Sequence, residues 1–319
     1  MRIIGTGSAL PKLAVSNDDL AKIMDTSDEW ISSRTGIRKR HIATEETTTS
    51  LSVDAAMKAL EASDTKPEEI DMIIAATVSS DKIIPTLSCE VQAAIGATNA
   101  VAFDIGAACS GFLFALATAN AYMKTAGYKK ILVIGAEVLS KLMDWNDRST
   151  CVLFGDGAGA CVVSNEEDEL FAMVQGSDGK SGDALTCMNR PVVNPYTDNA
   201  VGEMDHVHMN GQAVYKFAVK TVPKAIKEAL CKVGLEADDI DHYVLHQANI
   251  RIIESVAKRL SQPMSKFPIN LTECGNVSAA SVPILLDKVV RDGTIKRGDK
   301  VVLSGFGAGL TWGACVLRF

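Results

Sequence analysis

Two periodicities of apolar residues alternate along the chain. Short continuous apolar runs rich in Val and Ile are typical of strands that are buried on both faces. These runs lie at 72–76, 131–134, 243–245 and 301–303. Longer segments between them, such as 51–62 and 215–233, carry apolar residues at every third or fourth position, which predicts amphipathic helices. The alternation predicts an α/β protein whose strands are covered by helices on both faces.

The second half of the chain repeats the first. Five residues on matching segments recur 170 positions later, so that Ala59 corresponds to Ala229 and Asp71 to Asp241. The other pairs are Ala55 with Ala225, Leu60 with Leu230 and Ile70 with Ile240. We interpret the repeat as a gene duplication that produced two similar halves, residues 1–165 and 166–319. Two unrelated helix–loop–strand units of similar pattern are the alternative. Duplicated halves would pack about a pseudo-twofold axis, with a site where their corresponding loops meet.

Cys109 is the first candidate for chemistry. An apolar, strand-like segment leads through small residues to Cys109, and a helical pattern runs from Gly111 to about Thr125. A thiol in such a strand-to-helix turn faces unpaired N–H groups and the positive end of the helix dipole. We therefore expect a lowered thiol pKa and a nucleophilic thiolate. A buried cysteine in a tight turn is the alternative.

Two further segments contain polar side chains at corresponding places. His246 ends the strand predicted at 243–245, and Asn276 lies among small residues that open a helix. A structural histidine and a simple Gly-Asn turn are the separate alternatives. The repeat, however, places Asn276 in the counterpart of the turn that carries Cys109, and His246 just past the counterpart of the strand at 72–76. It therefore predicts that Cys109, His246 and Asn276 lie close together.

Composition narrows the class of protein. The chain has 319 residues, of which 47% are hydrophobic and 22% charged, which favours a large core over long disorder. A formal net charge of -7 gives no general attraction to nucleic acid. No apolar run reaches the roughly 18 residues that cross a bilayer, and the first residues lack the layout of a signal peptide. We therefore expect a cytoplasmic protein that does not enter the membrane.

Metal and nicotinamide chemistry have no sequence motif in this chain. None of the eight cysteines stands in a C-x-x-C pair, which leaves a zinc site unsupported. No G-x-G-x-x-G opens a helix after a strand with an acidic residue about 20 positions on, which argues against a nicotinamide oxidoreductase. We expect neither a metal nor a bound cofactor.

Six motifs in order resemble the β-ketoacyl-acyl-carrier-protein synthase III family over essentially the whole chain. They lie at 28–37, 108–112, 154–160, 246–249, 275–281 and 305–313. The resemblance implies the thiolase-like fold, in which two duplicated halves form a five-layered α/β/α/β/α arrangement, usually as a homodimer. Val277 stands where the family usually has Thr, and Ala308 where it usually has Gly. Both replacements keep the residue small.

The resemblance also implies the reaction, a decarboxylative condensation that starts fatty acid synthesis. Cys109 would accept an acyl group from acyl-CoA, which is a substrate and not a cofactor. Decarboxylation of malonyl-acyl-carrier protein would then give an enolate that attacks the acyl group. His246 and Asn276 would donate hydrogen bonds to the enolate oxygen, and the backbone N–H groups of Cys109 and Ala308 would form the oxyanion hole.

Binding residues for CoA follow from the same resemblance. Trp30 would stack near the adenine, and Arg148 would cover its other side. Arg34 would contact phosphate, which its planar guanidinium suits. A partly buried helix aromatic is the alternative for Trp30.

Acyl carrier protein is acidic, so docking on an acidic enzyme requires a local basic patch. The helix predicted after Asn249 buries one apolar face and directs Arg251, Lys258 and Arg259 away from it. We expect these three residues to dock the carrier protein. An ordinary solvated face is the alternative.

Two other functions remain open from the sequence. A paralogous condensing enzyme of secondary metabolism would keep the fold and use a different acyl primer. A non-catalytic relative would only bind acyl thioesters, but intact Cys109, His246 and Asn276 speak against it. The primer itself depends on the acyl pocket, which the sequence does not define.

Overall fold

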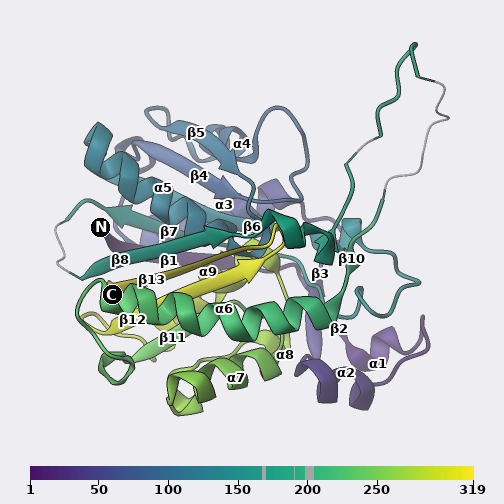
Figure 1. Ribbon diagram of the computed structural model, residues 1–319. Coiled ribbons are helices and arrows are strands. Elements are labelled where there is room, and N and C mark those ends of the chain that lie inside the picture. The colour runs from purple at the N-terminus through teal and green to yellow at the C-terminus, as the bar shows by residue number, and fades with distance from the viewer. Residues whose placement is uncertain (167–169, 190, 198–204) are drawn as a thin grey trace.

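Two large β-sheets dominate this computed structural model, which describes residues 1–166, 170–189, 191–197 and 205–319 (Figure 1). The first sheet has the strand order β1-β7-β6-β4-β5 and the second the order β11-β12-β13-β8. The first comprises β1 (Arg2–Ala9), β7 (Gly157–Ser164), β6 (Lys130–Glu137), β4 (Met72–Ala76) and β5 (Val101–Ile105). The second comprises β11 (His242–Leu245), β12 (Lys300–Gly307), β13 (Thr311–Arg318) and β8 (Phe171–Ser177). The four apolar runs of the sequence are thus confirmed as β4, β6, β11 and β12.

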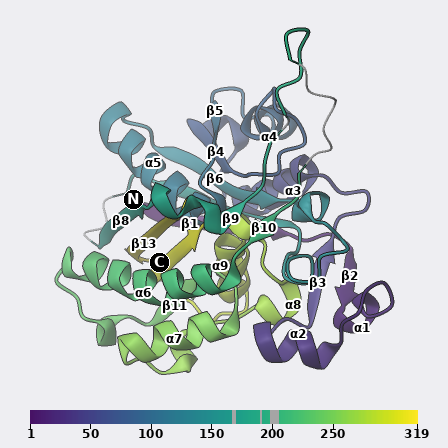
Figure 2. The same ribbon diagram turned by 45° about the vertical axis from the view of Figure 1, so that its right-hand side comes forward.

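Helices form three layers around these sheets. The middle layer is α5 and α9, whose apolar faces share one core with strands of both sheets. The outer layers are α3 with α4 on the first sheet, and α6 with α7 on the second, at the bottom of both views (Figures 1 and 2). Their bounds are α3 (Thr48–Ala62), α4 (Leu87–Ile95), α5 (Gly111–Ala126), α6 (Gly211–Cys231), α7 (Ile250–Leu260) and α9 (Ser281–Arg291). The five-layered α/β/α/β/α arrangement is confirmed.

The halves repeat one another strand for strand. In both sheets an outer strand, β1 or β8, pairs antiparallel with β7 or β13, and the next two strands, β6 with β4 and β12 with β11, are parallel. The repeat partners Asp71 and Asp241 even make the same contact, because each carboxylate accepts from the N–H of the first residue of a strand, Lys130 or Lys300. The predicted duplication is confirmed. Residues 167–169, next to its expected boundary at 165/166, lie outside the described part, and the boundary stays a prediction.

Shorter elements complete the fold around one end of the sheets. A two-stranded sheet, α1 and α2 lie beside α8, at the lower right of Figure 2. A second strand pair, β9 with β10, precedes α6. The bounds are β2 (Leu13–Ser16), β3 (Lys39–Ile42), β9 (Leu185–Thr186), β10 (His208–Met209), α1 (Asn17–Leu20), α2 (Asp28–Thr35) and α8 (Leu271–Cys274). In the described part of the chain, no helix combines the length and apolar character of a membrane span.

Candidate active site

Cys109 lies in the short turn that connects β5 to α5, as the sequence predicts. This turn is a 3-10 helix, η2 (Ala108–Ser110), and Ala108 in it adopts a left-handed conformation with φ of 44°. The second half contains the same kind of turn in η7 (Ser278–Ala280), which precedes α9 and in which Ser278 has φ of 45°. The two turns pack against each other at the interface between the halves. The repeat therefore brings its two corresponding turns together at Cys109.

Glycines at the interface allow this close approach. A Cβ atom at Gly307, the last residue of β12, would lie 2.8 Å from Cys109 Cβ, 2.9 Å from its backbone N and 3.2 Å from its Sγ. A Cβ atom at Gly305, two residues earlier in β12, would lie 3.0 Å from the Cys109 carbonyl oxygen. Any side chain at these positions would displace the nucleophile. Strand β12 therefore forms one wall of the site.

The thiol of Cys109 is 6% exposed, and burial raises its pKa to about 12. A hydrogen bond from Ser278 and the Cys109 backbone N–H oppose this rise, whereas the charge of Glu137 adds to it. The expectation of a lowered thiol pKa is therefore wrong for the unliganded chain. The start of α5 does face the thiol, but the loss of hydration outweighs the stabilisation of the thiolate.

His246 follows β11 directly and continues its ladder, since its backbone N–H donates to Ser304 O at 2.8 Å. Its ring packs edge-on against Phe306, with centroids 5.3 Å apart. The side chain is 2% exposed and its Nδ1 is buried without a hydrogen-bond partner. Burial lowers the pKa of His246 to about 3, so the imidazole is neutral at pH 7 and acts as a hydrogen-bond donor through one ring N–H.

Asn276 is held by its backbone and by its side-chain oxygen. Its N–H donates to Leu153 O and its carbonyl accepts from Gly155 N–H, both at 2.9 Å, which clamps it to a segment of the first half. The side-chain Oδ1 accepts from Ser278 N–H at 2.9 Å. This contact orients the amide so that its NH2 group is the donor available to a ligand.

The loop of Ala308 is tied to the turn of Cys109. Thr311 Oγ1 donates to Ala308 O at 2.9 Å and also lies 3.3 Å from Ala107 O. Ser110 Oγ lies 2.6 Å from the same Thr311 hydroxyl. These contacts keep the Ala308 loop beside Cys109, as an oxyanion hole built from both backbone N–H groups requires.

The three residues expected to bind CoA also come together. The Arg34 guanidinium carbon lies 4.7 Å and that of Arg148 5.1 Å from the centre of the Trp30 ring. Trp30 is half-buried on α2, whereas both arginines are exposed. Arg148 is anchored to the Asp25 carboxylate at 3.2 Å. The indole is therefore flanked by two cations, a surface that suits an aromatic base and its phosphates.

The expected carrier-docking residues lie on α7, next to this cluster. Arg251, Lys258 and Arg259 are all exposed on the face opposite the buried Ile253, Val256 and Leu260. The start of α7 is joined to the end of α2, because Asn249 Nδ2 donates to Arg34 O at 3.0 Å and Arg251 Nη2 to Ser33 O at 2.7 Å. The predicted basic face and the predicted CoA site are therefore contiguous.

Sequence reasoning assigned no individual role to several residues that shape the site, and it did not single out Glu137 at all. Ser278, Gly307 and Thr311 contact the turn of Cys109, and Glu137 lies behind Ser278. The repeat contained a signal for two of them. Glu137 and Gly307 stand 170 positions apart at the ends of β6 and β12, so a buried acid in one half replaces a glycine in the other.

Comparison with known proteins decides the family. Residues 103–179 match the model of 3-oxoacyl-[acyl-carrier-protein] synthase III, and residues 230–319 match the model of the C-terminal part of the same enzyme. A β-ketoacyl-[acyl-carrier-protein] synthase III from Clostridium acetobutylicum is 51% identical over 100% of this chain and 98% of its own length. The chain belongs to the 3-oxoacyl-acyl-carrier-protein synthase III family. It is thus a condensing acyltransferase of fatty acid synthesis, and the resemblance seen in the sequence is confirmed.

Solved structures of this family have the same fold. The crystal structure of a 3-oxoacyl-[acyl-carrier-protein] synthase III from Aquifex aeolicus has a TM-score of 0.92 and 44% identity, covering 100% of this chain and 99% of that one. A priming β-ketosynthase of a polyketide biosynthetic pathway has a TM-score of 0.93 and 37% identity, covering 99% and 96%. The thiolase-like fold is confirmed. The alternative of an enzyme of secondary metabolism is not favoured, because the curated relatives at 44–51% identity are synthases III.

Proposed function

We propose that Cys109 is the nucleophile of this synthase III, and that His246 and Asn276 are the donors that drive decarboxylation. The observation that carries the proposal is the position of Cys109 at the start of α5, packed between Ser278 and Gly307 of the other half. His246 is joined to the end of β12 that lies against Cys109, through Ser304 and Phe306. Asn276 is joined through Ser278 to η7, which packs against the turn of Cys109. The arrangement offers one nucleophile and two neutral donors in a water-poor site.

The first half-reaction transfers the acyl group. Cys109 Sγ adds to the thioester carbonyl of acyl-CoA and forms a tetrahedral intermediate. Its collapse breaks the bond to the CoA sulfur, and CoA leaves as a thiol with the proton that Cys109 loses. Negative charge develops on the carbonyl oxygen during the attack. The backbone N–H groups of Cys109 and Ala308 would stabilise it, since such donors act strongly where water is excluded.

The second half-reaction forms the carbon–carbon bond. Malonyl-acyl-carrier protein loses CO2 and leaves an enolate, whose carbon attacks the acyl group and releases Cys109 with a 3-oxoacyl product. The enolate oxygen requires hydrogen-bond donors that are too weakly acidic to protonate the nucleophilic carbon of the enolate. Neutral His246 and the Asn276 amide fit this requirement, because neither is acidic at pH 7.

Acyl-CoA and the carrier protein would bind at adjacent surfaces. For CoA we propose the indole of Trp30 with Arg34 and Arg148, where the adenine would take the place of one stacked guanidinium. For acyl carrier protein we propose the α7 face of Arg251, Lys258 and Arg259. The join between α2 and α7 supports this division, because both thioester substrates must reach the same Cys109.

We also propose a homodimer. The outer strand β5 pairs with β4 and shows an open edge in the described sheet, where Val101 is 48% exposed. The exposed Ile83 and Ile84 precede α4, which covers the same half. An open edge with apolar neighbours is a surface that a second copy can cover. The cytoplasmic location stays a prediction of the sequence.

Intact mass spectrometry after incubation with a panel of acyl-CoAs tests the nucleophile and identifies the primer. We expect a mass increase of one acyl group with acetyl-CoA or another short acyl-CoA, and none in Cys109→Ser. An increase that persists in Cys109→Ser would refute the assignment of the nucleophile. A preference for long or unusual acyl groups would favour a primer of another pathway.

A further inference from the structure

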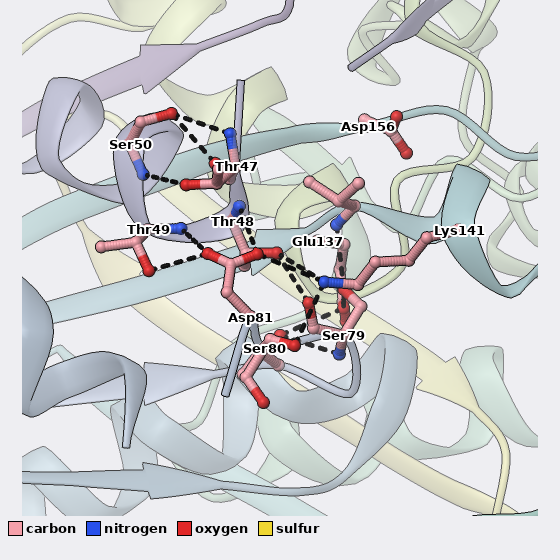
Figure 3. Close-up of polar contacts among 12 residues, drawn as sticks. Thr47, Thr48, Thr49, Ser50, Ser79, Ser80, Asp81, Glu137, Lys141 and Asp156 are labelled. Atoms are coloured by element: carbon pink, nitrogen blue, oxygen red, sulfur yellow. Dashed lines mark hydrogen bonds and ion pairs between the residues drawn. The ribbon is translucent and has the colours of Figure 1, made fainter. Parts of the chain in front are cut away.

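Glu137, the last residue of β6, is a carboxyl group wholly inside the protein. Its Oε2 accepts from the hydroxyl of Ser79, which lies beside it in Figure 3. The same oxygen accepts from Val78 N–H at 3.1 Å and from the Thr77 hydroxyl at 3.2 Å. Its Oε1 is buried and makes no well-aligned hydrogen bond. One oxygen is therefore held by the segment that follows β4, and the other faces the interior without a firm partner.

Ser278 lies between this carboxyl and the nucleophile. It belongs to η7, which packs both against β6, the strand that ends at Glu137, and against η2, the turn of Cys109. From this position its hydroxyl favours the ionised form of each group. The contact with Glu137 is loose, since Oε1 lacks a well-aligned donor. Ser278 itself is fixed at φ of 45° by the turn η7, and its N–H is bonded to Asn276. Ser278 is thus placed between the turn of Cys109 and the end of β6 that carries Glu137.

The surroundings hold Glu137 rigidly. Ser79 Oγ accepts from Val138 N–H at 2.9 Å, and Ser79 O accepts from the Thr48 hydroxyl at 2.6 Å. Beyond this segment, Lys141 and Asp81 pair with each other at 3.3 Å (Figure 3). Among the titratable groups, Cys109 therefore interacts electrostatically with Glu137, and the charges of Lys141 and Asp81 compensate each other.

We propose that Glu137 is a positioning residue that controls the ionisation of Cys109 through Ser278. The inference rests on the proposed nucleophile and extends it to Glu137, a residue that lies outside all six sequence motifs. In its neutral form the carboxyl can donate to Ser278, whose own hydrogen then points at the sulfur and stabilises the thiolate. In its ionised form the carboxylate accepts the hydrogen of the Ser278 hydroxyl, which then no longer points at the sulfur. The negative charge of the carboxylate also repels the thiolate.

The direction of the effect follows from burial. Burial raises the pKa of Glu137 to about 7, so the group is neutral below this pH and ionised above it. Its negative charge raises the pKa of Cys109. As the pH rises through about 7, ionisation of Glu137 therefore counteracts ionisation of the thiol. The pH dependence of thiol reactivity should flatten there before it rises again.

Alkylation of Cys109 by iodoacetamide tests this, because it reports thiol ionisation whether or not acyl-CoA is a substrate. The rate is measured from pH 5 to 10 by mass spectrometry of the Cys109 peptide in the full chain. Glu137→Gln keeps the shape of the side chain and removes its charge. We expect alkylation about tenfold faster above pH 7, as for a fall of about one unit in thiol pKa, and no flattening near pH 7.

The matched control is Asp156→Asn. Asp156 is also fully buried with a pKa raised by burial, but it is bonded to Ala43 N–H and Ser140 and does not act on Cys109. Its variant should follow the wild-type profile. Ser278→Ala is the second test, and it should slow alkylation, since it removes a donor to the thiolate.

A folded Glu137→Gln with the wild-type profile would overturn the proposal, and so would a Ser278→Ala that alkylates at the wild-type rate. If Glu137→Gln does not fold, the wild-type profile decides, because a profile that rises through pH 7 without flattening would also overturn the proposal. Failure of acyl transfer from acyl-CoA with these alkylation profiles intact would instead count against the proposed substrate.

Discussion

At the scale of single residues, His246 and Cys109 are both almost fully buried, and burial favours the neutral form of each. Each is held in its neutral form, with pKa values of about 3 and 12. A neutral imidazole suits its proposed role, because it can donate a hydrogen bond to the enolate oxygen without protonating the enolate carbon. The thiol, in contrast, must lose its proton to act as a nucleophile, and its raised pKa keeps most of it protonated at pH 7.

Removal of either donor should separate the two half-reactions. In His246→Ala and Asn276→Ala we expect malonyl decarboxylation to fall about 100- to 1,000-fold, as is typical for loss of one such donor. Acylation of Cys109 should continue in part, since it depends on backbone N–H groups. Release of CO2 from malonyl-acyl-carrier protein and the mass of the acyl-enzyme measure the two steps separately. A variant that lost acylation but still decarboxylated would reverse the assignment.

Burial of neutral His246 also predicts sensitivity to acid. Its folded pKa lies below its ordinary 6.5, so below about pH 6.5 the unfolded chain binds a proton that the folded chain does not. Stability from this group is therefore complete above pH 6.5 and is lost as the pH falls toward 3. Between pH 7 and 5 the wild type should lose about 2 kcal/mol more of its free energy of unfolding than His246→Asn.

Urea unfolding at the two pH values measures this loss. The exposed His206 provides the control, since His206→Asn should leave the pH dependence as in the wild type. Equal pH slopes for wild type and His246→Asn would show that His246 becomes charged inside the folded protein.

At the scale of elements, strong amphipathic patterns translate directly into packing. The sequence predicts a buried apolar face on α7 at Ile250, Ile253, Val256, Ala257 and Leu260. The last four are buried, whereas Ile250, the first residue of the helix, is only partly buried. Ile252 is buried as well, because α7 also packs against α6. One residue of the basic face already has a partner within the chain. Arg251 donates to Ser33 O in the last turn of α2, where a cation is favourable.

Charge reversal on α7 should affect one substrate only. In Arg251→Glu and Lys258→Glu we expect a several-fold rise in KM for malonyl-acyl-carrier protein and little change in KM for acyl-CoA. Lys258→Glu is the cleaner test, because Arg251 also contacts Ser33. Lys296→Glu, an exposed charge near the opposite end of β12, is the control. An equal effect on both substrates would remove the docking assignment.

At the scale of the whole molecule, the duplicated fold was predictable because the repeat keeps its register. Asp71 and Asp241 recur 170 positions apart, and so do η2 and η7, so the sequence alone could bring Cys109 and Asn276 together. The ionisation of Cys109 was not predictable, because it depends on burial by β12 and η7 from the other half. The role of Glu137 was not predictable either. Its repeat partner is Gly307, but in the sequence Glu137 is one more charged residue after an apolar run, and its burial depends on the fold.

The open edge of β5 predicts assembly. Val101→Arg places a charge at this edge, and we expect it to convert the proposed dimer to monomer in sedimentation analysis. Ile23→Arg changes another apolar side chain, 67% exposed beyond α1, and should leave the assembly unchanged. A Val101→Arg chain that sediments like the wild type would place the interface elsewhere.

The division of the site between the two repeats has a genetic consequence. Ala279 occupies the place of Cys109 in the second turn, so the proposed nucleophile lies in the first repeat, whereas the two proposed donors, His246 and Asn276, lie in the second. A gene cut between the repeats would encode two inactive fragments. Activity from the co-expressed pieces would then be a direct readout of their reassociation, as in a split reporter.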